Sequence, residues 1–263
     1  GFVGVEGEQE MYQDKLQIKI TDIWLHEPST EELTDLLPST RKNIDEMFTE
    51  VTALMHSLEH PAAKALAAAY LDDAQLMKDF RVAPAAMQIH HAWIGGLLEH
   101  TLQLMKLADA MLPNYSRLNR DIILIALFIH DMGKVEELRW DRGFEYTREG
   151  NLIGHIARGA MWLEGKAKVA EEALGEPLPD GFLTVMQHIV LSHHGLLEHG
   201  AAKLPSTPEA IFVSQLDNLD AHTQTALDSA RPWEKTAVGD EAFTERMWSL
   251  NTKLYRRDPL KNA

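Results

Sequence analysis

Two hydrophobic patterns divide the chain near residue 26. Before that point, Leu16, Ile18 and Ile20 alternate with polar residues, which is the two-residue period of a half-buried strand. The pattern predicts a short β-hairpin within residues 1–26. An isolated hairpin is only marginally stable in water, so we expect this one to pack on another part of the protein or to belong to a larger sheet.

After about residue 29 the apolar positions recur at helical spacing. Proline opens or follows several of these segments, and Asn119 is a typical helix-capping residue. The pattern predicts helices over residues 40–58, 61–70, 74–79, 85–111, 120–131, 154–174, 181–194, 208–227 and 240–256, with a loop or a little extended structure at 143–147. The predicted fold is all-α with a β appendage.

The helix expected at 120–131 is apolar on almost every side and ends in His130-Asp131, followed by Gly133. Such a helix is buried. An imidazole and a carboxylate at its end then cost several kcal/mol, on the order of 2–7 for a polar group, unless they are paired or bind a cation. A capping role for Asp131 alone does not account for the adjacent His130.

Other apolar helices also present histidine or aspartate. His193-His194 ends one helix, and Asp217 ends the apolar run 210–217 within another. His155 starts a helix and His100 lies within one. Each of these side chains alone could be a hydrogen-bonded core residue. Together they indicate a metal site, because helical bundles build such sites from inward-facing side chains of several helices.

Composition narrows the chemistry. The 263 residues include no cysteine, so a metal must sit on nitrogen and oxygen ligands, which suit manganese, iron, cobalt, nickel, zinc or magnesium. The formal net charge of −15 argues against a broad basic footprint for duplex nucleic acid. No apolar run reaches the roughly 18 residues of a membrane span, and the first residues do not resemble a secretory signal. We expect a cytoplasmic protein without membrane contact.

The order of His100, then His130-Asp131, then Asp217 resembles the HD superfamily of metal-dependent phosphohydrolases. The phrase His130-Asp131-Met132-Gly133-Lys134 matches its central motif. The resemblance implies an all-helical core in which His100, His130, Asp131 and Asp217 bind one ion.

A closer resemblance is to the YhaM-type 3′→5′ exoribonucleases, which join a nucleic-acid-binding OB-fold to an HD domain. The matching stretches are residues 90–101, 130–134, 154–156, 192–195 and 209–221, and residues 11–20 look like the last strands of that OB-fold. An OB-fold needs five strands. We therefore interpret residues 1–26 as the remnant of an OB-fold-like module and residues 27–263 as the HD-type domain.

The resemblance implies hydrolysis of single-stranded RNA or a short oligonucleotide from its 3′ end, with one or two divalent ions, manganese being the preferred choice. Asp131 would be a catalytic bridging ligand, with His155 and one or both of His193 and His194 on the second ion. Lys134 is either a catalytic residue that stabilises substrate phosphate or a solvated lysine. His91, expected roughly 13–15 Å from His100 along one helix, is a candidate substrate contact.

Two other functions stay open. A hydrolase of small nucleotides or cyclic dinucleotides is favoured by the reduced β module. A non-catalytic, metal-binding regulatory domain would keep the same ligands, although the intact ligand set argues against it. Self-association into a homo-oligomer is possible with each of these functions.

Overall fold

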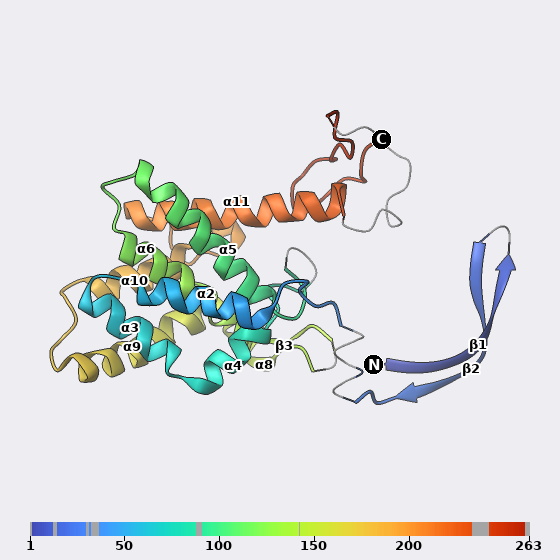
Figure 1. The fold of residues 1–263 in the computed structure, drawn as a ribbon, viewed down its shortest axis with the longest axis horizontal. Helices are drawn as coiled ribbons and strands as arrows, with labels where there is room; N and C mark the ends of the chain where they lie inside the picture. The colour runs from blue at the N-terminus through green and yellow to red at the C-terminus, as the bar shows by residue number, and fades with distance from the viewer. Residues whose placement is uncertain are drawn as a thin grey trace.

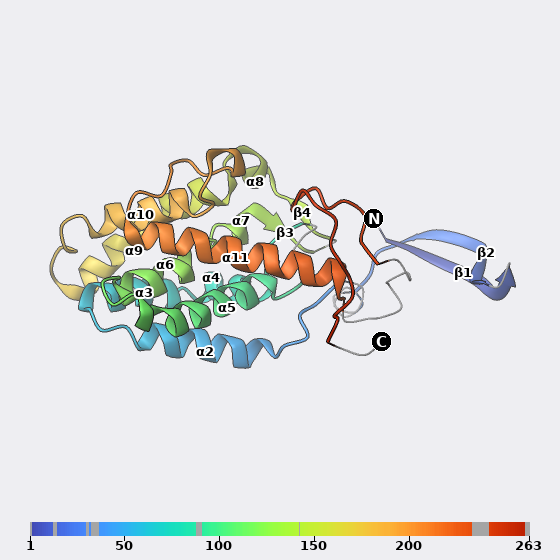
Figure 2. The same ribbon diagram turned by 90° about the horizontal axis from the view of Figure 1, so that it is seen from above.

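The computed structural model describes residues 2–12, 15–29, 32, 37–87, 91–141, 143–232 and 242–260. A helical bundle forms the body of the molecule, and one β-hairpin projects from it (Figures 1 and 2). The elements are β1 (Phe2–Tyr12), β2 (Lys15–His26), α2 (Ile44–His56), α3 (Pro61–Leu71), α4 (Ala74–Val82), α5 (Gly96–Met111), η1 (Leu112–Asn114), α6 (Arg120–Ile129), α7 (Lys134–Glu137), β3 (Leu138–Arg139), β4 (Glu145–Tyr146), α8 (Arg148–Leu152), α9 (Gly154–Leu174), α10 (Phe182–Ser192), η2 (Leu197–His199) and α11 (Pro208–Ala230). The predicted helical fold class is confirmed.

The centre of the bundle is α6. Residues 123–129 are each at most 1% exposed, as expected for a helix that is apolar on all sides. Phe128 meets the rings of Tyr70 and Phe80 edge-on, with centroids 6.2 and 5.8 Å apart. Packing against α5, α10 and α11 fixes the end of α6, and with it His130 and Asp131, deep inside the protein.

The N-terminal hairpin has the predicted strands, which form a two-stranded sheet of their own within the described residues. β1 and β2 pair antiparallel from Phe2↔His26 to Tyr12↔Lys15, with an irregularity after Glu6. Leu16, Ile18 and Ile20 share one face and remain 66, 58 and 53% exposed. No described part of the chain covers that face.

Two predicted helices are wrong in extent or in kind. The helix expected from residue 85 begins at Gly96, because His91 and Gly95 have positive φ angles of 57° and 79°, which do not fit a right-handed helix. The helix expected at 240–256 does not form in its described part, residues 242–256. There the chain makes antiparallel bridges on either side of Asn251, whose φ of 52° does not fit a helix.

None of the helices in the described ranges combines the length and the apolar character needed to cross a membrane.

One close backbone approach positions the loop after Asp131. A Cβ atom on Gly133 would lie 2.2 Å from the carbonyl oxygen of His155. The glycine therefore lets the start of α7 rest directly on the start of α9. Gly165, further along α9, has no atom within 4 Å of the same hypothetical Cβ.

We expect Gly133→Ala to lower the free energy of unfolding by about 1–3 kcal/mol, because the added methyl group overpacks a backbone contact. Gly165→Ala is the matched control and should raise that free energy by up to about 1 kcal/mol, since alanine is the better helix former. Urea denaturation followed by circular dichroism in the presence of chelator measures both. Equal stability of the two variants would contradict the assigned contact.

Candidate metal centre

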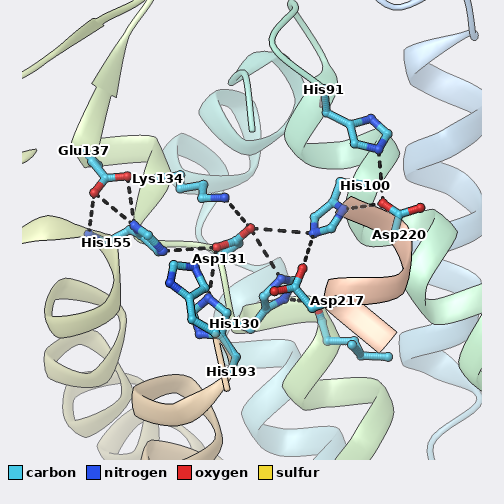
Figure 3. A network of polar contacts seen from close by, with 12 residues as sticks. His91, His100, His130, Asp131, Lys134, Glu137, His155, His193, Asp217 and Asp220 are labelled. Carbon is cyan, nitrogen blue, oxygen red and sulfur yellow. Dashed lines mark hydrogen bonds and ion pairs between the residues drawn. The ribbon is translucent and has the colours of Figure 1, made fainter. Parts of the chain in front are cut away.

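Five helices or helix ends deliver polar side chains to one point in the bundle (Figure 3). His100 comes from α5, His130 and Asp131 follow α6, His155 lies in the first turn of α9, His193 and His194 follow α10, and Asp217 lies in α11. All seven predicted ligand side chains are thus brought together. They form cluster A, which is His100, His130 and Asp217, and cluster B, which is Asp131, His155, His193 and His194.

The carboxylate of Asp131 lies between the two clusters. Its Oδ2 atom is 3.4 Å from Nε2 of His130 and 3.8 Å from Nε2 of His100. Its Oδ1 atom is 3.4 Å from Nε2 of His155 and 3.5 Å from Nε2 of His193. Each oxygen therefore faces a different cluster, which is the placement a bridging ligand requires.

Backbone carbonyl groups hold three of the rings. Nδ1 of His130 is 2.8 Å from the oxygen of Leu127, and Nδ1 of His193 is 2.7 Å from the oxygen of Val190. Nδ1 of His194 lies 2.8 Å from the oxygen of His199. A carbonyl oxygen can only accept, so each Nδ1 carries the proton that it donates. The Nε2 atom then offers a lone pair, the form in which a neutral imidazole binds a metal.

Carboxylates hold the other two rings. Nδ1 of His155 is 2.9 Å from Oε1 of Glu137, and Nδ1 of His100 is 2.7 Å from Oδ2 of Asp220. Metal-binding histidines commonly have such an outer partner, which fixes the tautomer and the orientation of the ring. The sequence alone did not single out Glu137 or Asp220. The one available signal was the position of Asp220, one helical turn after Asp217.

The electrostatics favour ionised carboxylates, and they favour neutral imidazoles at His193 and His194. Burial opposes ionisation of Asp131, but Lys134 and His130 outweigh it and hold the pKa of that carboxyl well below its usual range. Burial lowers the pKa of His193 and brings the pKa of His194 to about 3. For His100, burial is outweighed by hydrogen bonds to Asp217 and Asp220, which raise its pKa to about 9.

Several buried atoms in the two clusters have no hydrogen-bond partner among the described residues. They are Nε2 of His130, Oδ1 of Asp131, Nε2 of His155 and Nε2 of His193. An unsatisfied buried polar atom costs about 1–3 kcal/mol, so four that converge on one point call for an occupant. Divalent cations bound by nitrogen and oxygen fit this donor set.

Lys134 and His91 also lie at the centre. Nζ of Lys134 donates to Oδ2 of Asp131 at 2.7 Å, and the side chain is 12% exposed. The ring of His91 is 1% exposed, with its centroid 5.4 Å from that of His100. The expected separation of these histidines was wrong, because His91 lies outside the helix with a left-handed backbone that costs on the order of 1–3 kcal/mol. Its neighbour His90 falls outside the described residues.

Comparison with known proteins gives a consistent result. Residues 97–222 match the family model described as the HD domain. A protein from Geobacillus sp. (strain WCH70) is 34% identical over 255 residues, which cover 97% of this chain and 75% of the relative. Proteins from Listeria innocua and Bacillus subtilis are 32% and 30% identical and cover the same share of this chain and 77% of each relative. All three are named 3′-5′ exoribonuclease YhaM. No solved structure is significantly similar to the chain.

We expect the protein, purified without chelator, to carry about two divalent ions per chain, because the two clusters share Asp131. Elemental analysis measures this. Less than about one-tenth of an equivalent, with no binding when manganese is added, would contradict the site.

We expect His155→Ala and His193→Ala each to lower the metal content from about two ions to about one, since both belong to cluster B. His222→Ala, which removes an exposed histidine of α11, is the control and should leave the content unchanged. A single ion in the parent protein, unaffected by either substitution, would leave only cluster A as a site.

Proposed function

Because this chain belongs to the YhaM family of HD-domain, metal-dependent phosphohydrolases, we propose that it hydrolyses single-stranded RNA from the 3′ end. The observation that carries the proposal is the carboxylate of Asp131, which presents one oxygen to each of two histidine clusters. Two-metal sites of this kind cleave phosphodiesters by stabilising both the attacking and the leaving oxygen.

His100, His130, Asp131 and Asp217 would hold one ion, and Asp131, His155, His193 and His194 would hold the other. Bound divalent ions supply a water of lowered pKa and polarise a phosphoryl oxygen. Three histidines are already oriented for binding, because their Nδ1 protons are donated to backbone carbonyl groups. No proton therefore has to leave Nε2 of His130, His193 or His194 before that nitrogen binds an ion.

Lys134 is the cationic side chain among the residues that we assign to the site, and it contacts Asp131 directly. Asp131 raises the pKa of Lys134 against the effect of burial, so the ammonium stays charged. A substrate phosphate beside Asp131 would receive hydrogen bonds from Nζ, which already lies 2.7 Å from the carboxylate. Contact of His91 with substrate stays a prediction.

Without ions the site repels phosphate. The pKa values of Asp131, Asp217 and Asp220 are all lowered, so three carboxylates are ionised close together, and the whole chain has a net charge of −15. Divalent ions would reverse the local charge and draw in the RNA backbone. Binding of substrate should therefore depend on metal more strongly than on any basic patch.

A second candidate is a hydrolase of small nucleotides or cyclic dinucleotides. The observation that favours it is that every side chain of the two clusters comes from the helical domain and none from the hairpin. A small substrate could therefore be held by the clusters alone. We take residues 1–26 as the remnant of an OB-fold-like module and residues 27–263 as the HD-type domain, with manganese as the ion and the cytoplasm as the location. Self-association stays a prediction.

We expect Asp131→Ala to reduce RNA hydrolysis at least about a hundredfold, because it removes a ligand from both clusters. The helical circular dichroism spectrum should persist, since the change also removes a buried charge. Asp109→Ala, on the partly exposed end of α5, is the control. A folded Asp131→Ala protein with near-normal turnover would contradict the assignment.

Substrate preference separates the two candidates. We expect 5′-labelled single-stranded RNA with a free 3′ hydroxyl to give a ladder of shortened products in the presence of manganese. The same RNA blocked at its 3′ end should resist. Rapid hydrolysis of mononucleotides or cyclic dinucleotides, with intact RNA, would favour the second candidate.

A further inference from the structure

We propose that Asp220 is a positioning residue that holds His100 in the tautomer required for metal binding. Asp220 is 2% exposed and lies on α11, one turn after Asp217. The inference rests on the proposed binding of an ion at cluster A. In this proposal Asp220 strengthens the binding of that ion through His100, without contacting the ion or the substrate.

The imidazole of His100 is clamped between two carboxylates of the same helix (Figure 3). Oδ2 of Asp220 is 2.7 Å from Nδ1, and Oδ1 of Asp217 is 3.2 Å from Nε2. The form of His100 that binds an ion is the neutral imidazole, which has one ring proton, and only one of these carboxylates can receive that proton. The shorter contact assigns the proton to Nδ1, so Nε2 keeps its lone pair on the side of cluster A.

Both oxygens of Asp220 are engaged from outside the clusters. Nε2 of Gln103 donates to Oδ1 at 2.9 Å, and Nε2 of His91 lies 3.2 Å from Oδ2. His91 reaches this position through its left-handed backbone conformation. Three side chains from α5 and the segment before it thus fix a carboxylate of α11, which indicates that the position of Asp220 is specified and not incidental.

His91, His100 and Asp220 are close enough together to form a metal-binding group of their own. The distances argue against that use. At 2.7 Å, Nδ1 of His100 and Oδ2 of Asp220 are joined by a direct hydrogen bond, so Nδ1 carries a proton and offers no lone pair to an ion. The group is therefore a support for cluster A.

Removing Asp220 would free the other tautomer. Without the carboxylate that holds the Nδ1 proton, the neutral ring places its proton on Nε2 and donates it to Asp217, so the ring offers the ion a hydrogen in place of a lone pair. Asp220→Ala should then weaken the ion at cluster A by about 10–100-fold, the usual effect of losing an outer partner of a metal ligand, while the ion at cluster B is retained.

The test is titration of the chelator-treated full chain with Mn²⁺ alone, measured by calorimetry, together with ¹⁵N NMR of the histidine rings in the metal-free protein at a pH above the His100 pKa of about 9, where that ring is neutral. We expect Asp220→Ala to weaken one of two Mn²⁺ affinities and to move the His100 proton from Nδ1 to Nε2. Asp220→Asn should have a smaller effect, because its amide oxygen can still accept from Nδ1 if the amide of Gln103 turns over. Asp109→Asn removes the same charge from α5 beyond the clusters and should change neither measurement.

Two unchanged Mn²⁺ affinities and a proton that stays on Nδ1 in Asp220→Ala would overturn the proposal. If that variant does not fold, Asp220→Leu, which has a similar shape but no acceptor, decides in the same way, and affinities equal to those of the parent would overturn the proposal. Metal binding is measured without RNA, so a parent that binds two Mn²⁺ but does not hydrolyse RNA would refute the proposed function and leave the role of Asp220 standing.

Discussion

The structure depends on one buried carboxylate. Asp131 follows a helix whose residues 123–129 are almost completely buried, and Asp131 itself is 2% exposed. The neighbouring elements supply partners for that charge. Lys134 forms an ion pair with the carboxylate. One histidine of α5, one of α9 and those that follow α6 and α10 direct Nε2 towards it. The cost of the buried charge is offset only while these elements stay packed together, so the fold and the metal centre are one arrangement.

Sequence patterns located the helices that carry ligands but not the turns between them. α6 and α10 were predictable because a long apolar segment that ends in a polar pair is typical of a buried helix that leads into a site. His91 was misplaced because helical periodicity does not reveal a left-handed residue, and the bend at His91 to Gly95 brings it beside His100. The helix predicted over residues 240–256 was wrong for a similar reason, because Asn251 also has a positive φ angle.

The site shows the same division. The candidate ligand side chains were found from residue type and from resemblance, since each stands at the end or on the buried side of an apolar segment, and the structure brings them together. The residues that orient these rings were not predictable. Glu137 and Asp220 each contact a histidine ring nitrogen, and Gln103 contacts the carboxylate of Asp220. In the sequence all three look like ordinary polar residues of helices, and only tertiary packing brings them to these positions. Partners contributed by the backbone, such as the oxygens of Leu127 and Val190, leave no mark in the sequence.

Those backbone partners limit where residues can be inserted into or deleted from the chain. His130 and His193 each donate from Nδ1 to the carbonyl group three residues earlier. The histidine and the carbonyl group that orients it therefore belong to the same helix end, and the length of that helix sets the position of both. Inserting or deleting one residue inside α6 or α10 would rotate the end of that helix by about 100° and swing both away from the clusters together. Loops such as residues 175–181 carry no such restriction. Variation in length among related sequences should therefore collect in the connections and spare the two helices.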